Sequence, residues 1–400
     1  MSLFFVLACL SPLLLFDAPF EAGSRVKTGL EVLIEKDFAP LRSKRVGLLT
    51  AETALTHDRR RAIDVLAQAP DVKLAAIFAP EHGLSADRTG QIEDGVDKLT
   101  GVPIYSLYQS GRHHPTPDML KDVDVFVYDI PQFGARFLTR ITLLGYCIEA
   151  AAKKGIPFYV LDRPNFINGV DVAGPLLDDK YVSLVGYMRM PIRHGMTAGE
   201  LALMMNGERK LGADVKVIRM EGWKRSMWYD ETGLEWMNPS PNIRNLTQAT
   251  LYPGVCLLES PQVSVGRGTD TPFQVVGAPW FRAREIAAHL NARGLPGVSF
   301  MARRFRPEAS VYQGEVCEGL DILLINRGVF DPVLMGLELL AAVLKFHPEE
   351  FRLESVMRLL GSDEAATRLK RGEAGGEILA AMRGQLDEFL RIRAAYLLYE

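Results

Sequence analysis

The order of the apolar runs along this chain constrains its fold more than any other feature. Between residues 45 and 162, short apolar runs alternate with stretches of helical pattern, such as those at 60–68 and 138–153. Strands that alternate with helices form a mostly parallel sheet covered on both faces. We therefore predict a Rossmann-like α/β domain. Its strands are expected at 45–50, 74–79, 102–107, 123–130 and 157–162.

The second half of the chain predicts a smaller domain of a different kind. A helix is expected after Thr197 and a further strand at 215–220, and the segment from 222 to about 271 is rich in Pro, Asn, Gly and Trp. Long ordered loops of that composition often carry function. We predict a Rossmann-like domain over 25–235 and an auxiliary α+β domain over 236–400. The latter should hold a helix at 283–292, a strand at 298–305, a hairpin at 311–325 and then mostly helices.

The first residues have the character of a targeting segment. Leu3 to Phe16 is an almost unbroken apolar run, about as long as a signal-peptide core and too short to span a bilayer comfortably. We expect residues 1–22 to be a signal peptide and the protein to be periplasmic or secreted, with no stable membrane span once the leader is removed. A mis-assigned start would instead leave the protein in the cytoplasm.

Composition and missing motifs exclude several functions. The net charge of -3 argues against a nucleic-acid binder. No G-x-G-x-x-G follows the first expected strand, so a dinucleotide cofactor is disfavoured. Neither a metal-binding histidine pair nor a G-x-S-x-G nucleophile elbow is present. We expect no cofactor and no metal, and the chemistry that remains is acid–base work by carboxyl groups. Hydrolysis of a glycosidic bond is a familiar example.

The segment Pro80-Glu-His-Gly83 carries the strongest candidate for that chemistry. It follows directly on the buried run 74–79, and groups just beyond the carboxyl end of a strand line the ligand crevice of open α/β sheets. A carboxylic acid there is well placed for proton transfer. The alternative interpretation is that Glu81 caps a helix and His82 packs locally.

Further polar clusters fall in loops, several of them at expected strand ends. Taken singly, each is explained as a salt-bridged turn or a rigid loop. Together they favour a site for an anionic, hydroxyl-rich ligand, because Arg binds carboxylates bidentately and Asn both donates and accepts. The candidates are Asp129, Arg136, Asp162, Arg163, Asn165, Arg193, His194, Asn238, Ser240, Asn242, Arg267 and Asp270.

Nine ordered motifs resemble the bacterial exo-β-N-acetylmuramidases, a family long catalogued as a domain of unknown function. The similarity runs from about Val26 to the C-terminus. The motifs are Arg45-Val-Gly-Leu-Leu-Thr50, Pro80-Glu-His-Gly-Leu84, Gly134-Ala-Arg-Phe137, Leu161-Asp-Arg-Pro-Asn165, Asn168-Gly-Val-Asp-Val-Ala-Gly-Pro175, Arg193-His-Gly-Met-Thr197, Pro239-Ser-Pro-Asn242, Gly266-Arg-Gly-Thr269 and Gly277-Ala-Pro-Trp280.

The resemblance implies an active-site cleft between the two domains and release of N-acetylmuramic acid from the non-reducing end of peptidoglycan fragments, either muropeptides or MurNAc-GlcNAc fragments. Glu81 matches the glutamate usually proposed as catalytic, beside His82, and is expected to act as the general acid. The lactyl carboxylate of the substrate is expected to pair with Arg136, Arg163, Arg193 or Arg267. The candidates for a second catalytic group are Asp129, Asp162, Glu259 and Asp270.

Two departures from the family pattern keep alternatives open. Many relatives carry Asp-Ile-Gln-Asp-(Val/Ile)-Gly, whereas this chain has Asp129-Ile-Pro-Gln-Phe-Gly134. Relatives also often place tyrosines where this chain has Leu138 and Arg140. The alternatives are a catalytically silent muropeptide-binding protein and a hydrolase of a related sugar acid.

Overall fold

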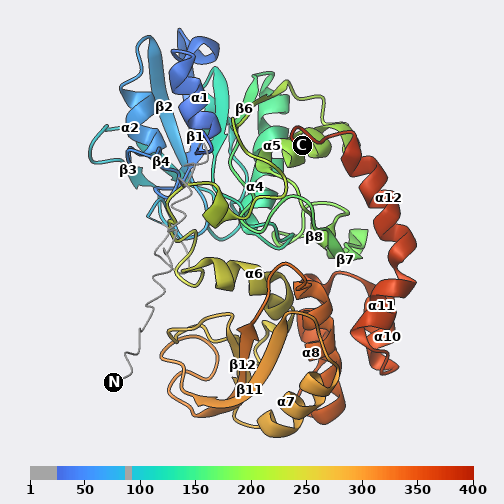
Figure 1. Cartoon of the computed structure of the whole chain (residues 1–400). Helices are drawn as coiled ribbons and strands as arrows, with labels where there is room; N and C mark the ends of the chain where they lie inside the picture. Colours follow the sequence, from blue (N-terminus) through green and yellow to red (C-terminus); the bar gives the residue numbers. More distant parts are fainter. Residues whose placement is uncertain (1–24, 86–91) are drawn as a thin grey trace, which may run out of the picture.

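The computed structural model describes residues 25–85 and 92–400, so the expected signal peptide at 1–22 lies outside the described residues. The larger domain is built on a seven-stranded sheet of order β3-β4-β2-β1-β5-β6-β9 (Figure 1). Every neighbouring pair is parallel except β3 and β4, which confirms the mostly parallel sheet. The strands are β1 (Lys44–Thr50), β2 (Val72–Ala79), β3 (Gly95–Val96), β4 (Pro103–Ser106), β5 (Val125–Asp129), β6 (Phe158–Leu161) and β9 (Val215–Ile218).

Alternate side chains of the central strands pack into two separate hydrophobic cores, one on each face of the sheet. On β5, Val125 and Val127 pack with the helices of one face, and Phe126 and Tyr128 pack with those of the other. Successive side chains of a strand point to opposite faces, so a strand apolar throughout is buried on both sides. The result is a helix–sheet–helix sandwich with α1 (Gly29–Glu35) and α2 (Ala62–Ala67) on one face, and α4 (Thr139–Lys154) and α5 (Ala198–Glu208) on the other.

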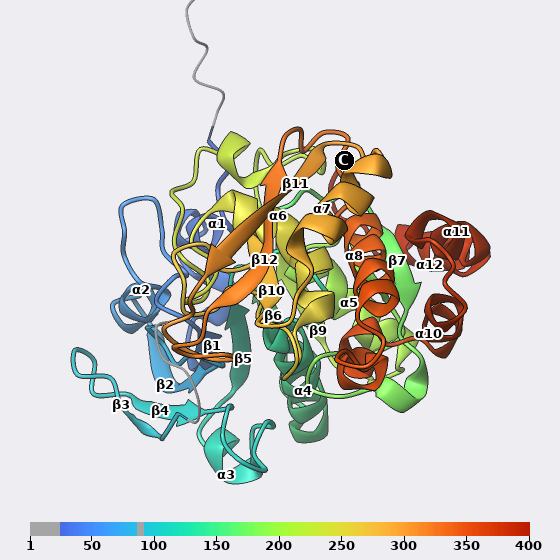
Figure 2. The same cartoon turned by 90° about the horizontal axis from the view of Figure 1, so that it is seen from below.

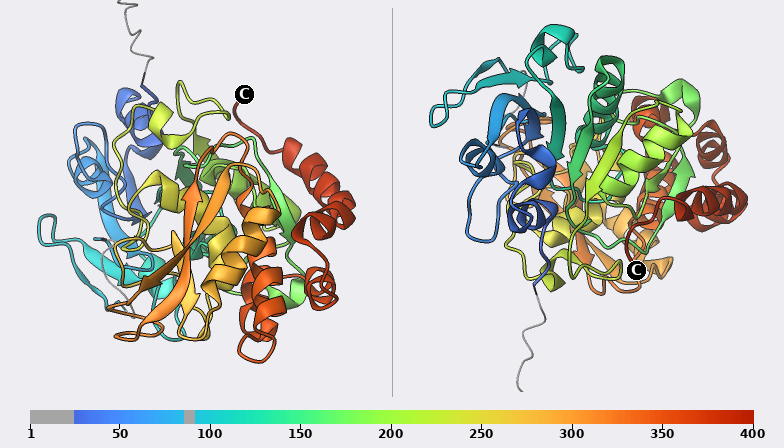
Figure 3. Two further views of the ribbon diagram at one scale, coloured as in Figure 1. Left: turned by 60° about the horizontal axis from the view of Figure 1, so that its bottom comes forward. Right: turned by 90° about the horizontal axis from the view of Figure 1, so that it is seen from above.

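The smaller domain lies below the first in Figure 1, with α6 (Leu246–Val255) between them. Its antiparallel sheet has the order β10-β12-β11 and packs against α7 (Ala283–Ala292), which in turn packs against α8 (Pro332–Phe346), as Figure 2 and the left view of Figure 3 show. The predicted helix at 283–292 and strand at 298–305 are confirmed. The strands are β10 (Val275–Ala278), β11 (Val298–Phe305) and β12 (Cys317–Leu324).

The predicted hairpin at 311–325 is wrong. Residues 311–315 form hydrogen-bonded turns, such as Glu315 N–H to the Tyr312 carbonyl at 3.0 Å, and only Cys317–Leu324 is extended. The physical reason is that β12 is the central strand of its sheet. Both of its edges are occupied, by β10 and by β11, so no edge is left for a strand from the preceding segment.

The chain ends on the larger domain rather than on the smaller one. After α9 (Met357–Leu360), α10 (Asp363–Lys370) and α11 (Gly375–Ala381), α12 (Arg383–Ala394) runs back along the side of the molecule (Figure 1). The Tyr399 hydroxyl donates to Asp162 at 2.6 Å, and the Leu398 N–H donates to Glu200 at 2.9 Å. Over 25–85 and 92–400, no helix combines the length and the apolar composition that crossing a membrane requires.

Candidate active site

The turn after β2 holds Glu81 at the carboxyl edge of the large sheet. His82 and Gly83 both adopt left-handed backbone angles, with φ of 72° and 71°, and the Gly83 N–H donates to the Pro80 carbonyl at 3.1 Å. Two successive residues with positive φ reverse the chain direction sharply. Gly83 adopts this conformation at no steric cost because it has no Cβ. The Glu52 N–H, from the loop after β1, donates to the Leu84 carbonyl at 2.6 Å and fixes the turn against the sheet.

The Glu81 carboxylate accepts a hydrogen bond from α4 and lies near a partly buried phenol. The Thr139 Oγ1 donates to Glu81 Oε2 at 2.7 Å, from the first residue of α4. Burial and the nearby Glu81 charge raise the pKa of Tyr108, just beyond β4, to about 12. Among residues 25–85 and 92–400, no helix begins at Glu81. The sequence analysis missed both residues, although Tyr108 follows an expected strand and could have been found by that rule.

The Glu81 side chain lines a cavity of about 340 Å³ at the junction of the two domains. We call it the junction cavity. Pockets for small ligands commonly have roughly this size or somewhat more, about 300–1,000 Å³. The larger domain contributes Glu81, His82, Phe133, Phe137, Leu138, Thr139 and Arg140. The loop before α6 contributes Ser240 and Ile243, α6 contributes Tyr252, and the smaller domain contributes Glu259, Arg267, Phe273 and Ser310.

A second carboxylate, Glu259, faces the same cavity as Glu81. Its Oε1 lies 2.5 Å from Arg267 Nε, and the Arg267 guanidinium lies 5.0 Å from the centre of the Phe273 ring. Burial lowers the pKa of Arg267, but the charge and the hydrogen bond of Glu259 outweigh it, so the net shift is upward. The smaller domain therefore presents a carboxylate and a permanently charged guanidinium to the cavity.

Arg140 places a second guanidinium in the cavity wall. It is almost completely buried and donates to the carbonyls of Pro131 and Pro239, which belong to loops of different parts of the chain. Burial lowers the pKa of Arg140, and the nearby Tyr128 and Glu81 oppose the shift. At this position the chain therefore has a cation in the cavity wall, where the family resemblance leads one to expect a phenol.

Several residues proposed from the sequence lie in a buried polar layer instead of in the junction cavity. We use this name for Asp129, Arg136, Asp162, Arg163, Asn165, Arg193 and His194. Arg163 contacts Asp129 through two bonds, Nε to Oδ1 at 2.5 Å and Nη2 to Oδ2 at 3.0 Å. Asp129 is fully buried, and both of its carboxylate oxygens are bound by Arg163.

Asp162 and Asn165 hold loops and a helix end in place. Asp162 accepts from the Thr197 hydroxyl at 2.7 Å and from the Gly199 N–H at 2.9 Å, at the start of α5. Burial raises the pKa of Asp162 to about 6, although its hydrogen bonds favour the charged form. Asn165 donates to the Met196 carbonyl at 3.1 Å and accepts from the Ile167 N–H at 3.2 Å. These contacts define structural roles.

Arg136, Arg193 and His194 likewise have their hydrogen-bond partners within the protein. Arg136 is fully buried and donates to four backbone carbonyls, those of Pro175, Met190, Leu359 and Leu360. Arg193 donates to the Ile167 carbonyl at 2.5 Å and pairs with Asp171 at 3.1 Å. His194 accepts from the Met196 N–H at 3.1 Å, and burial, with the charges of Arg393 and Arg193, lowers its pKa to about 3.

The remaining proposed residues divide between the cavity and the surface. Ser240 and Arg267 line the junction cavity together with Glu81 and His82. Asn242 is buried and its backbone N–H donates to the Ser240 hydroxyl at 3.4 Å, whereas Asn238 is exposed and accepts from the Trp236 ring N–H. Asp270 is exposed and lines a different hollow of the smaller domain.

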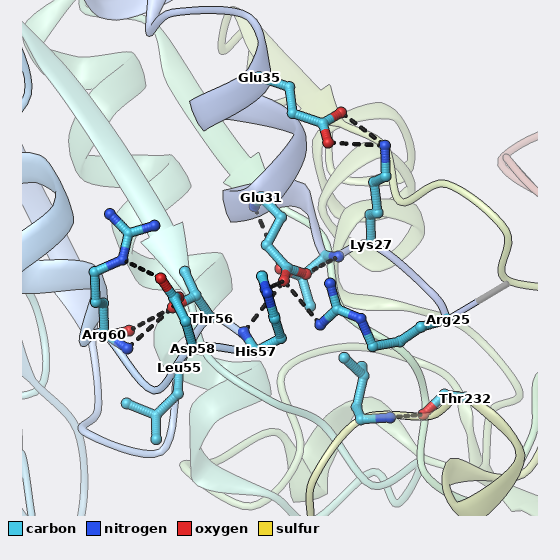
Figure 4. Close-up of polar contacts among 12 residues, drawn as sticks. Arg25, Lys27, Glu31, Glu35, Leu55, Thr56, His57, Asp58, Arg60 and Thr232 are labelled. Atoms are coloured by element: carbon cyan, nitrogen blue, oxygen red, sulfur yellow. Dashed lines mark hydrogen bonds and ion pairs between the residues drawn. The ribbon is translucent and has the colours of Figure 1, made fainter.

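A further polar cluster, which the sequence analysis did not find, lies beyond the end of β1 (Figure 4). Arg25 and His57 both point at the Glu31 carboxylate, at 3.0 Å and 2.9 Å. Burial raises the pKa of Glu31, but hydrogen bonds from Thr28 and His57 outweigh it and the net shift is downward. This cluster ties the start of α1 to the loop after β1, and borders a separate hollow of about 270 Å³ that Arg163 also lines.

Two carboxyl groups that face one cavity are the groups that glycosidases commonly use. The N-terminal part of the chain, residues 46–247, matches the family model described as "Exo-beta-N-acetylmuramidase NamZ, N-terminal", and residues 250–399 match "Exo-beta-N-acetylmuramidase NamZ, C-terminal". The chain belongs to the exo-beta-N-acetylmuramidase NamZ family of glycosidases.

Individual relatives agree over almost the whole length. The chain is 39% identical over 380 residues to the peptidoglycan beta-N-acetylmuramidase NamZ of Bacillus subtilis (strain 168), covering 94% of this chain and 92% of the relative. Two crystal structures of DUF1343 family proteins from Bacteroides fragilis NCTC 9343 are also similar. They have TM-scores of 0.86 and 0.76, identities of 37% and 31%, and each match covers 94% of this chain and 99% of theirs.

Proposed function

We propose that this protein releases N-acetylmuramic acid from the non-reducing end of peptidoglycan fragments, with Glu81 as the general acid. The observation that carries this role is the placement of Glu81: a carboxyl group in the wall of the junction cavity, bound by the Thr139 hydroxyl and close to Tyr108. Fixed geometry matters because a general acid must lie within hydrogen-bond reach of the leaving oxygen.

The second carboxyl group that glycosidases commonly use is best represented by Glu259. It lines the junction cavity with Glu81, from the opposite domain. The competing candidates Asp129 and Asp162 are enclosed in the buried polar layer, and Asp270 lies in another hollow. Both carboxyl groups therefore face the space that one substrate would occupy.

The lactyl carboxylate of the substrate would pair with Arg267 or Arg140. Both side chains line the junction cavity, although each already has a partner within the protein: Glu259 for Arg267, and the Pro131 and Pro239 carbonyls for Arg140. Arg136, Arg163 and Arg193 do not line this cavity. Guanidinium groups bind carboxylates through paired N–H bonds, which distinguishes an acidic sugar from its neutral analogue.

The test is a release assay with a chromogenic β-N-acetylmuramide and the matching β-N-acetylglucosaminide, using the wild type, Glu81→Gln and Glu235→Gln. Glu235 is the control, since it is an exposed carboxylate paired with Arg59 outside the cavity. Cleavage of the muramide alone, lost only in Glu81→Gln, supports the proposal. Binding of muramic acid by the wild type without any turnover would instead identify a silent binder. Selective cleavage of another sugar acid would identify the related hydrolase.

We also propose that the protein is exported, because the apolar run Leu3 to Phe16 resembles a signal-peptide core and peptidoglycan lies outside the cytoplasm. Fractionation of cells and mass spectrometry of the mature N-terminus test this. A full-length chain that begins at Met1 and is recovered in the cytosol would contradict it.

A further inference from the structure

A second hollow, of about 510 Å³, lies on the smaller domain beside the junction cavity. We call it the outer hollow, and its polar lining consists of Arg244, Thr269, Asp270, Arg303, Arg306 and Glu308. Part of the Gly266-Arg-Gly-Thr-Asp270 motif therefore faces the outer hollow, although Arg267 of the same motif faces the junction cavity.

Only a thin backbone wall separates the two spaces. Arg267 and Ser310 line the junction cavity, and their chain neighbours Gly268 and Ala309 line the outer hollow. The Glu308 N–H donates to the Gly268 carbonyl at 2.8 Å, and a Cβ on Gly268 would lie 2.3 Å from the Ala309 nitrogen. Ala309 and Ser310 are both exposed, so they form a shared rim over which a ligand chain can pass from one space to the other.

Among the described residues, four charged groups of the outer hollow have no ion-pair partner, although Arg244 Nε donates to the Pro241 carbonyl at 2.9 Å. In the part of the chain that the structure describes, no carboxylate lies within ion-pair distance of Arg244 or Arg306, and no cation lies within that distance of Asp270 or Glu308. Arg303 pairs with Asp321 at 2.7 Å and holds the floor of the hollow. The neighbouring Arg304 differs, because it pairs with Glu318.

We propose that the outer hollow is a subsite for the aglycone, where Arg244 and Arg306 bind the carboxylate of a second acidic sugar in a longer glycan. This rests on the proposed function. The glycan of peptidoglycan alternates neutral and acidic sugars. When the first muramic acid is released, the first sugar of the aglycone is therefore neutral, and the next carboxylate is on the second sugar of the aglycone. Guanidinium groups suit that carboxylate, and Asp270 and Glu308 are acceptors for sugar hydroxyls.

The proposal predicts a preference that depends on substrate length. The disaccharide MurNAc-GlcNAc ends before the second carboxylate, whereas the tetrasaccharide MurNAc-GlcNAc-MurNAc-GlcNAc contains it. We expect Arg244→Gln combined with Arg306→Gln to lower kcat/KM for the tetrasaccharide by about threefold to tenfold, mainly through KM. The disaccharide should be cleaved as before. The difference should shrink at high salt, since exposed charges are screened.

The matched control is Arg304→Gln, which removes an arginine two residues before Arg306 but not from the lining of the hollow. An equal loss on both substrates, or no loss on either, would overturn the subsite while leaving the proposed function intact. If the wild type cleaves neither substrate, the proposed function fails. Calorimetric binding of the tetrasaccharide then decides the subsite: weaker binding by the double variant than by the control supports it, and equal binding overturns it.

Discussion

Two polar regions lie at the carboxyl edge of the large sheet, and their side chains have different partners. In the buried polar layer, Arg163 and Asp129 form a bidentate pair, and Arg136 donates to four carbonyls. In the junction cavity, Glu81 is half-buried and accepts from the Thr139 hydroxyl, which a substrate can join or replace. Polar residues beyond strand ends therefore serve two purposes, and only the set of contacts tells them apart.

The difference has a physical origin. Loops that cross over the end of a sheet bury backbone groups, and each buried carbonyl or N–H needs a partner. Arginine and asparagine side chains supply several such bonds each, so they are useful there without any ligand. A catalytic group must instead face a space that a ligand can enter. That condition selects Glu81, Glu259, Arg140 and Arg267.

The largest expected effect is on Glu81, and it concerns turnover rather than stability. Glu81→Gln should reduce kcat/KM on a β-N-acetylmuramide by about 10²- to 10⁴-fold, because general acid catalysis is typically worth that much. The midpoint of urea unfolding should stay close to that of the wild type, since the amide keeps an acceptor for Thr139. Unfolding at much lower urea, with activity lost in proportion, would show that Glu81 belongs with the structural group.

The converse is expected in the buried polar layer. Arg163→Leu should lower the free energy of unfolding by about 3–5 kcal/mol, because it leaves the Asp129 carboxylate buried and unpaired. Combining Arg163→Met with Asp129→Leu should recover most of that loss, as apolar pairs often replace buried ion pairs without penalty. Urea unfolding of the three proteins measures this. If the Arg163→Leu protein were as stable as the wild type and had lost only substrate affinity, Arg163 would be a substrate-binding residue and the structural role would be wrong.

His194, in the buried polar layer, should make the stability of the protein depend on pH. Its pKa is about 3 in the folded protein, against roughly 6.5 in an unfolded chain, so it is neutral when folded. The stability that this contributes is present above about pH 6.5 and is lost as the pH falls toward 3. Relative to His194→Gln, the wild type should lose up to about 1.4 kcal/mol per pH unit in that window. Parallel pH profiles would show that His194 can be protonated in place.

The smallest effect concerns the orientation of Glu81. Thr139→Val removes the hydroxyl that donates at 2.7 Å and should lower kcat about tenfold, with little change in KM. Thr142→Val is the control on the same helix, because the Thr142 hydroxyl is buried without a hydrogen-bond partner among the described residues. Equal activity of the two variants would mean that Thr139 does not position Glu81.

The large sheet could be predicted from the sequence because its pattern is local. Strands buried on both faces are apolar throughout, and the expected runs at 45–50 and 74–79 correspond to β1 and β2. The hairpin at 311–325 failed because strand pairing in the smaller domain is set by distant partners. Cys317–Leu324 pairs with β10, which lies some 40 residues earlier in the sequence, and with β11.

The sequence by itself determined the α/β architecture, the placement of Glu81 after a buried strand, and the family, since these depend on residue order and on motifs. Only the tertiary structure decided which polar residues face a ligand. Arg136 follows Gly134-Ala135 and Arg267 lies between two glycines, yet Arg136 binds four carbonyls in the interior and Arg267 lines the cavity. The reason is that burial and hydrogen-bond partners come from segments far apart in the chain, as when Leu359 and Leu360 accept from Arg136.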